Sequence, residues 1–92
     1  MQVTQNVTKQ KGASKLKVRF DFRKLEGRIV EKFGTRFKFA EAAGYTKSQM
    51  SARLNNKVDF SLSEIYELCT PELLDIPVAD IPAYFFIPRS YV

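Results

Sequence analysis

The chain has 92 residues, enough for one small domain, and its composition, 45% apolar and 13% aromatic, is that of a folded protein and not of a disordered chain. It contains no His and one Cys, Cys69, which excludes an intrachain disulfide, a zinc site of Cys and His, and His-dependent catalysis.

Neither a secretory signal nor a membrane span is predicted. The N-terminus is polar, and the longest apolar run, around Ile81 to Ile87, is too short to cross a bilayer. A single Cys also favours a reducing compartment. We therefore expect a cytoplasmic protein with no membrane partner, no metal and no cofactor.

The net charge of +5 at pH 7 is unevenly distributed along the chain. Residues 1–20 contain five Lys or Arg and no acid, and residues 21–57 contain nine against four acids. Residues 58–92 contain only Arg89 against six acids. This polarity predicts one end that attracts anions and one that does not. Chance clustering on a solvated surface is the alternative explanation.

The N-terminal segment is polar and basic. Residues 1–14 show no period, which predicts a mobile arm. From Lys15 to Phe20 apolar and polar side chains alternate, as in a half-buried strand. We therefore divide the chain into a flexible arm or edge strand over residues 1–18 and a folded domain over residues 19–92.

A first helix is predicted to end at Gly34 in a left-handed cap. Asp21 is its predicted N-cap, and Phe20 and Leu25 have the spacing of a hydrophobic staple. Gly27 inside the helix costs about 1 kcal/mol relative to Ala. Gly27 marks either a close contact with another helix or a position where the loss of helix stability is tolerated. The predicted apolar face consists of Phe22, Leu25, Ile29 and Phe33.

Two short helices are predicted over residues 36–43 and 47–55, capped by Thr35 and Thr46 and separated by Gly44. Their inward side chains are predicted to be Phe39, Ala40, Ala43, Tyr45, Met50 and Leu54.

The small residues Ala40 and Gly44, four positions apart, predict a close and steep crossing of these two helices. This is the pattern of a helix-turn-helix unit, whose second helix projects from the body of the domain.

The C-terminal part begins with the capping-box spacing of Ser61 and Glu64, followed by a helix that Pro71 interrupts. Thr70 is the predicted cap of a new turn, and the prolines allow at most a short helix near 77–81. The predicted core face is Leu62, Ile65, Leu68 and Cys69. The end is too apolar to hang freely, so we expect it to cover the core, pair as an edge strand or make a subunit contact; it contains Tyr84, Phe85, Phe86, Ile87, Tyr91 and Val92.

The outward side of the 47–55 helix carries side chains suited to base edges in a major groove. Lys suits guanine, Gln suits adenine, Ser suits either, and an Ala methyl meets the thymine methyl. The predicted base contacts are Lys47, Ser48, Gln49, Ser51 and Ala52. Helix ends with nearby cations hold phosphates. The predicted DNA backbone contacts are Arg36, Lys38, Thr46, Arg53, Asn55, Asn56 and Lys57.

Several stretches carry a family resemblance: FRKLEGRIVEKFGTRFKFAEAAG, MSARLNNK, FSLSEIYELC, and LLDIP followed by YFF. Through them, residues 21–86 resemble the small Cro-like helix-turn-helix regulators of temperate phages, in the lambda-repressor-like family. The resemblance implies an all-α fold of five helices that binds double-stranded operator DNA, usually as a homodimer, in the host-cell cytoplasm. It implies a phosphate contact for Arg36, base contacts for Lys47, Ser48, Ser51 and Ala52, and backbone contacts for Asn55 and Lys57.

Two residues depart from the family pattern. Arg53 stands where an apolar residue is usual, three positions after Met50. Either its aliphatic stem packs while its head reaches a phosphate, or the helix is rolled so that Leu54 points inward. Phe37 stands where a polar residue is usual. Either it packs against Phe33, which we favour, or it is an exposed anchor for a partner protein.

Three interpretations stay open for the basic N-terminal segment. It follows DNA phosphates or a minor groove; residues 15–20 pair as a strand with residues 85–92, within one chain or across a dimer; or it is an extension without a function.

Two functions fit these features. The first, which we favour because the helix-turn-helix is basic, is a Cro-type repressor that occupies an operator without any chemistry. The second is a modulator or antirepressor that docks onto a partner phage repressor and changes its operator binding. The residues proposed for a partner or dimer contact are Phe37, Tyr84, Phe85 and Phe86.

An enzyme is not expected and no catalytic residue is predicted, because the four glycines form no phosphate loop and no His is present.

Overall fold

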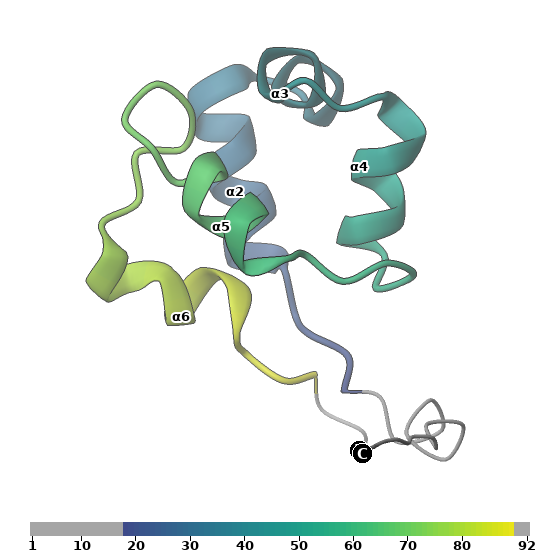
Figure 1. The fold of residues 1–92 in the computed structure, drawn as a ribbon, viewed down its shortest axis with the longest axis vertical. Helices are drawn as coiled ribbons and strands as arrows, with labels where there is room; N and C mark the ends of the chain where they lie inside the picture. The colour runs from purple at the N-terminus through teal and green to yellow at the C-terminus, as the bar shows by residue number, and fades with distance from the viewer. Residues whose placement is uncertain (1–17, 90–92) are drawn as a thin grey trace, which may run out of the picture.

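The structure, a computed structural model, describes residues 18–89, which form five α-helices and one 3-10 helix (Figure 1). The elements are α2 (Arg23–Phe33), α3 (Arg36–Ala43), α4 (Lys47–Leu54), α5 (Leu62–Leu68), η2 (Val78–Asp80) and α6 (Ile81–Phe85). The predicted all-α fold of five helices is confirmed. The predicted arm lies almost entirely outside the described residues, so the division of the chain after residue 18 stays a prediction.

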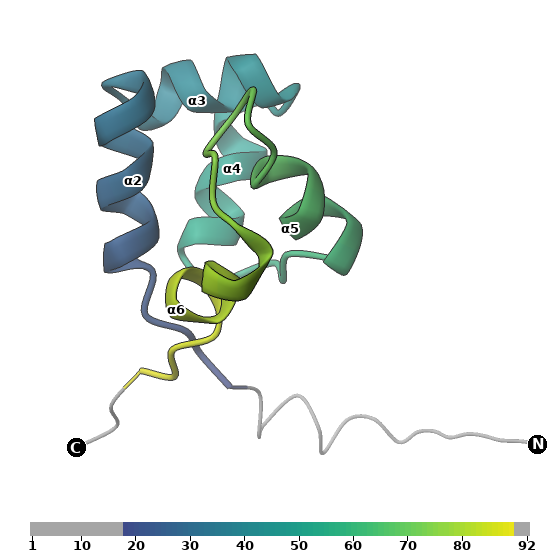
Figure 2. The ribbon, with the colours of Figure 1, turned by 90° about the vertical axis from the view of Figure 1, so that its left-hand side faces the viewer.

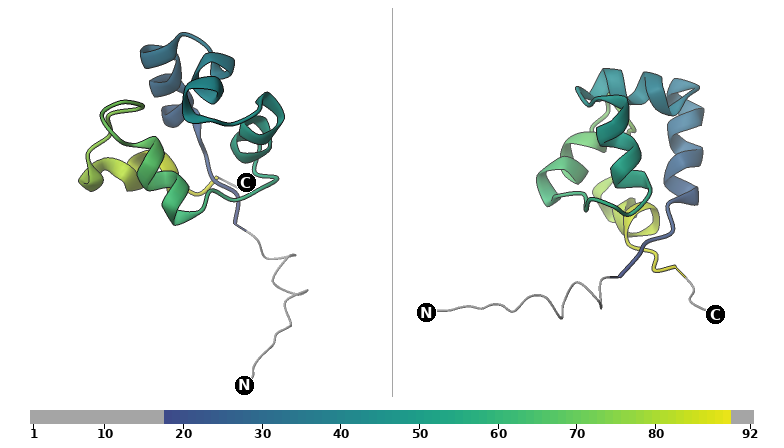
Figure 3. Two further views of the ribbon diagram at one scale, coloured as in Figure 1. Left: turned by 45° about the horizontal axis from the view of Figure 1, so that its top comes forward. Right: turned by 90° about the vertical axis from the view of Figure 1, so that its right-hand side faces the viewer.

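All five α-helices contribute side chains to one core. Helix α3 lies across one end of α2 and α6 lies across the other, while α4 and α5 close the remaining sides (Figures 2 and 3). The largest fully buried side chains are Phe39, Phe85, Leu25, Ile29, Met50, Leu68 and Leu74. Because short helices are marginally stable by themselves, this shared core is what holds each of them in place.

Helix α2 begins at Arg23, one residue later than predicted. Asp21 still bonds its first turn, since its Oδ1 accepts from the amide of Arg23 at 3.0 Å. The side-chain hydrogen bond from Arg23 lowers the pKa of Asp21 to about 2. A hydrophobic staple uses the residue just before the N-cap. Because the N-cap is Phe22, that residue is Asp21, which is not apolar, so the predicted staple of Phe20 with Leu25 is wrong. The Phe20 ring lies beside Phe22, with their centroids 6.2 Å apart.

Helices α3 and α4 form a helix-turn-helix whose threonine caps are as predicted. Thr35 accepts from the amide of Lys38 at 3.1 Å, and Thr46 accepts from the amide of Gln49 at 3.0 Å. Gly44 between the helices has φ 84° and ψ 23°. Figure 2 shows α4 turning steeply away from α3. The predicted bounds of α3 are confirmed, and α4 is one residue shorter than predicted.

Neither Gly27 nor Gly44 makes room for a close contact between helices. A Cβ built on Gly44 would meet nothing within 4 Å, so the predicted close approach there is wrong. Gly44 is needed instead for its left-handed φ, which costs an L-residue about 1–2 kcal/mol. A Cβ on Gly27 would also meet nothing within 4 Å. Gly27 is therefore a weak spot in α2 and not a helix contact.

Helix α5 has the predicted capping box, in which Ser61 Oγ accepts from the amide of Glu64 and Glu64 Oε1 accepts from the amide of Ser61. Its core face is only partly as predicted. Ile65, at 6% exposed, is buried, as are Leu68 and Cys69, but Leu62 is 81% exposed. Leu62 is the first residue of α5, and the core covers this helix only from Ile65 onward.

The predicted short helix near 77–81 is longer in the structure, because the 3-10 turn η2 leads directly into α6. Pro82 lies in the first turn of α6, where no amide donor is required. This extension carries Phe85 into the core at 2% exposed. Thr70 does not cap a new turn, since its hydroxyl donates back to the carbonyl of Glu67 at 2.9 Å.

The two ends of the described chain lie side by side. Phe20 and Pro88 form an isolated antiparallel bridge. The flanking hydrogen bonds run from the amide of Asp21 to the carbonyl of Ile87, at 2.7 Å, and from the amide of Arg89 to the carbonyl of Arg19, at 2.9 Å. Pairing within one chain therefore occurs, as a bridge and not as a strand. The rest of the predicted arm and the last residues, 1–17 and 90–92, lie outside the described part.

Replacing Gly27 by Ala is expected to raise the free energy of unfolding by about 1 kcal/mol, because the helix gains a better helix former and the new methyl group meets no neighbour. Gly44→Ala makes the same chemical change at φ 84° and is expected to lower the free energy of unfolding by about 1–2 kcal/mol. Urea denaturation followed by circular dichroism measures both. Destabilisation by Gly27→Ala would contradict the prediction.

Candidate functional site

The exposed side of the helix-turn-helix, which we call the α3–α4 surface, brings together six of the residues predicted to contact DNA. They line a shallow hollow of about 330 Å³ on α4, and they are Lys47, Ser48, Ser51, Ala52, Asn55 and Lys57. Helix α4 can project these side chains because Met50 and Leu54, at 0% and 4% exposed, bury its opposite side. Within the hollow, the side-chain Nδ2 of Asn55 donates to the hydroxyl of Ser51 at 3.3 Å.

Phe37 belongs to this surface as well. It is 48% exposed, and Nζ of Lys47 lies 5.8 Å from its ring centroid. Phe33 packs instead against Phe39, with their ring centroids 5.3 Å apart. The favoured packing of Phe37 against Phe33 is therefore wrong, and the alternative, an exposed aromatic side chain on α3, is what the structure contains.

Gln49, predicted to contact a base, has its side chain engaged within the protein. Its Oε1 accepts from the amide of Thr46 at 2.9 Å, which completes a capping box at the start of α4. Because both side chains satisfy amides of the first helical turn, neither Thr46 nor Gln49 presents its oxygen to a ligand without breaking the cap. The placement of this pair is explained by helix stability alone.

Arg53 is one of the less accessible predicted phosphate contacts, with its side chain 16% exposed. Its Nε and Nη2 donate to the two carboxylate oxygens of Glu64 at 3.1 and 2.9 Å, and its Nη1 donates to the carbonyl of Gln49 at 3.0 Å. The guanidinium also lies over the ring of Tyr45, 5.1 Å from its centroid. Leu54 points inward, as the alternative orientation of the helix requires. Arg53 thus joins α4 to α5, and this position does not suit a phosphate contact.

The hydrogen bonds between Arg53 and Glu64 also shift their proton equilibria. They lower the pKa of Glu64 and raise that of Arg53, so both groups are held in their charged forms. Burial and the nearby carboxylate of Glu64 raise the pKa of Tyr45, which keeps its hydroxyl neutral.

Arg36, at the start of α3, is also paired with an acid. Its Nη2 lies 2.6 Å from Oε1 of Glu26 on α2, and both side chains are about 40% exposed. Lys38 is exposed and donates its backbone amide to Thr35. The acids that neutralise Arg36 and Arg53 lie ten and eleven positions away in the chain, so local spacing gave no sign of either pair.

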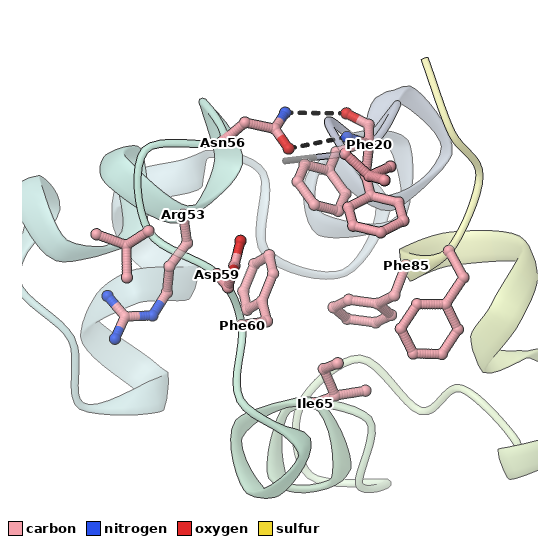
Figure 4. A pocket seen from close by; sticks show the side chains of 11 residues that line it. Phe20, Arg53, Asn56, Asp59, Phe60, Ile65 and Phe85 are labelled. Carbon is pink, nitrogen blue, oxygen red and sulfur yellow. Dashed lines mark hydrogen bonds between the residues drawn. The ribbon is translucent and has the colours of Figure 1, made fainter. Parts of the chain in front are cut away.

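Asn56 holds the N-terminal segment instead of reaching outward. Its Oδ1 accepts from the amide of Phe20 at 2.8 Å and its Nδ2 donates to the carbonyl of Phe20 at 2.9 Å (Figure 4). The residue has φ 63°, a conformation that Asn tolerates better than most residues. Its side chain is therefore engaged in holding the N-terminal segment, and sequence reasoning missed its partner Phe20 because that residue lies 36 positions away.

The aromatic C-terminal segment is divided between core and surface. Phe85 packs edge-on against Phe60, with centroids 5.3 Å apart, in a hollow of about 310 Å³ (Figure 4). Since Phe85 is buried in its own chain, it is not placed for the predicted subunit contact. Phe86 is 42% exposed at the rim of this hollow. Nζ of Lys24 lies 4.8 Å from the centroid of the Tyr84 ring.

Within residues 18–89, no group of three or more His, Cys, Asp or Glu side chains could hold a metal ion. Cys69 is buried, which raises the pKa of its thiol to about 11. It is therefore protonated and a poor nucleophile at neutral pH. In the same part of the chain, no helix is both long and apolar enough to span a bilayer.

Residues 18–87 match the model of a family described as proteins of unknown function (DUF739). The chain belongs to this family. Among the solved structures, this DUF739 chain is similar to the solution structure of the modulator of repression (MOR) of the temperate bacteriophage TP901-1 from Lactococcus lactis. The identity is 39% and the TM-score is 0.66, over 73% of this chain and 88% of that chain. No curated protein matches.

These comparisons correct the expected function of the DUF739 chain. The similar phage protein is a modulator of repression, so the expectation of a Cro-like, DNA-binding repressor is wrong. Neither operator DNA nor a homodimer gains support from the comparisons. The geometry offers a physical reason for the error. The helix-turn-helix is present, but the cations at Arg36 and Arg53 are paired with acids, and the side chains of Gln49 and Asn56 are engaged internally.

The pairing of Arg53 with Glu64 predicts a pH dependence of stability. The pKa of Glu64 is lowered from its ordinary value of 4.5, so its contribution is complete above about pH 4.5 and is lost as the pH falls through the lowered value. Glu64→Gln keeps the oxygen that caps α5 but removes the charge. At pH 7 it is expected to lower the free energy of unfolding by about 1–2 kcal/mol.

Thermal unfolding between pH 7 and pH 3 tests this expectation. The loss of Tm on acidification should be smaller in Glu64→Gln than in the wild type. Glu67→Gln, an exposed position on the same helix, is the control and should follow the wild-type curve. Parallel curves for wild type and Glu64→Gln would disprove the assigned role of the pair.

Proposed function

We propose that this protein modulates repression in a temperate phage, by binding a partner DNA-binding repressor and changing the operator binding of that repressor. The observation that carries the proposal is the 39% identity, over 73% of the chain, with a phage modulator of repression. This is the second of the two functions that the sequence suggested.

The state of the helix-turn-helix supports a protein partner over DNA. Operator binding draws most of its affinity from Lys and Arg side chains that replace the counterions of phosphates. In this chain, Arg36 and Arg53 are already compensated by Glu26 and Glu64. Recruiting either arginine to a phosphate would require breaking an ion pair inside the domain, and for Arg53 would leave the carboxylate of Glu64 partly buried without a counter-charge.

Exposed apolar side chains also support a protein partner. Nine large apolar residues of the described chain are at least 42% exposed. They lie on several elements, and the three most exposed are Leu62 and Tyr66 on α5 and Val78 on η2. Apolar groups of this kind gain little from a phosphate backbone but contribute strongly to the desolvated centre of a protein interface.

A modulator of this kind acts by linkage and needs no chemistry. If it binds the DNA-free repressor more tightly than the operator-bound repressor, it lowers operator occupancy, and the opposite preference raises it. With the modulator at 100 times its Kd for the DNA-free form, and no affinity for the bound form, the operator affinity falls by about 100-fold. No catalytic group or cofactor is needed for such an effect.

Gel-shift and calorimetric titrations with the repressor encoded beside this protein test the proposal. The protein alone should give no specific shift of the neighbouring intergenic DNA. Added to the repressor, it should change the repressor–operator shift by at least about tenfold in apparent affinity, and calorimetry should detect a complex without DNA. A repressor from an unrelated phage is the control and should be unaffected. An unchanged operator affinity, together with no heat of binding, would refute the proposal.

A further inference from the structure

The three most exposed large apolar side chains among the described residues all lie on one side of the molecule. Leu62 is 81% exposed, Val78 is 69% exposed and Tyr66 is 65% exposed. Two of them lie on α5 and one lies on η2. We call the surface that they form, together with the hollow between α5 and η2, the α5 face.

The α5 face is continuous. Leu62 and Tyr66 are four positions apart on α5 and therefore lie on the same side of the helix. Tyr66 and Val78 both line a hollow of about 370 Å³, which is also lined by the buried Cys69 and Ile76. An apolar ridge along the helix thus leads into a hollow with a fixed apolar floor, which is a shape that can receive a partner side chain.

Negative charge surrounds this apolar centre. From Val58 to Pro88 the sequence contains six acids and no Lys or Arg, and of these acids Glu64 is paired with Arg53 and Asp75 with Lys32. Glu67 is exposed directly after Tyr66 on α5, Asp75 lines the hollow, and Asp80 ends η2.

Cations from two neighbouring helices already contact this segment, since Arg53 of α4 pairs with Glu64 and two residues of α2 contact the stretch before η2. Arg28 donates to the carbonyls of Leu74 and Asp75, and Nζ of Lys32 lies 4.0 Å from the carboxylate of Asp75. Helix α4, which carries the basic hollow, lies by contrast across the domain from η2 (Figure 1). The domain therefore has an acidic apolar side and a separate basic side.

Nothing in the fold of the single chain requires this apolar surface. Leu62 occupies the first turn of a helix whose capping box already satisfies its amides, and a polar residue there would cost the core nothing. The aromatic hollow of Figure 4 is a weaker candidate, because its walls are core rings such as Phe60 and Phe85, which pack against each other and whose burial the fold already explains. The α3–α4 surface carries basic side chains, which would repel a basic partner.

We infer that the α5 face is the docking surface of this protein, and that its occupant is a positively charged face of the partner repressor. This inference rests on the proposed function. A repressor holds DNA phosphates with a surface rich in Lys and Arg, and an apolar centre with an acidic rim complements such a surface in charge. The apolar groups supply affinity at the centre, and the acids supply orientation and a fast encounter.

Paired variants of the full-length protein test the apolar centre by calorimetric titration with the repressor encoded beside it. Leu62→Ser combined with Tyr66→Ser should weaken binding by about tenfold or more. Val30→Ser combined with Phe37→Ser removes two comparably exposed apolar groups from α2 and α3, and should change the affinity by less than about twofold. All four side chains are exposed, and circular dichroism should report folded proteins.

Charge reversals test the acidic rim. Glu67→Lys, on α5, should weaken binding and reduce its salt dependence, because it replaces an attraction by a repulsion. Glu41→Lys makes the same change on α3 and is the matched control, expected to leave both quantities near those of the wild type.

The outcomes separate this inference from the proposed function. If the wild type binds the repressor and the α5 variants bind within about twofold of it, the inference is overturned while the proposed function stands. The same conclusion follows if the α2–α3 pair, and not the α5 pair, loses binding. If the wild type does not bind the repressor at all, both fall together.

Discussion

The bidentate ion pair between Arg53 and Glu64 is the contact that joins helix α4 to helix α5, and the proposed function rests on it as well. One guanidinium reaches the capping box of α5, the backbone of α4 and the ring of Tyr45, so it fixes the two helices relative to each other. The same contact withdraws a cation from the surface that a DNA-binding protein would present. One side chain therefore bears both on the packing of these two helices and on the proposed preference for a protein partner, and a change at Glu64 would affect both.

How far the sequence predicts this structure depends on the distance over which the signals act. Helix starts at Thr35, Thr46 and Ser61 and the stop at Gly44 are local features, determined by hydrogen bonds over three or four residues, and these agree with the structure. The errors concern partners far apart in the chain. Examples are Asn56 with Phe20, at a separation of 36 residues, and Arg53 with Glu64. No periodicity reports such pairs, because they form only when helices pack.

The wrong expectation of a Cro-type repressor has a related origin. The stretches that resemble Cro-like regulators are those that build a helix-turn-helix, and they report the fold and not its use. A phage modulator of repression is similar in fold and 39% identical to this chain. The quoted stretches do not report that two cations of this helix-turn-helix are balanced by acids from other helices, or that several outward positions are apolar. The exposure of Leu62, expected in the core, belongs to this second class of feature.

The bridge between Phe20 and Pro88 has a mechanical consequence. Because it is antiparallel and lies at the outer end of both segments, the described chain enters and leaves the domain at one point. A pulling force applied between the two ends would load the bridging hydrogen bonds one after another, as in opening a zipper, before any helix carried tension. The domain would therefore resist little force along that direction, even though its helical core is well packed.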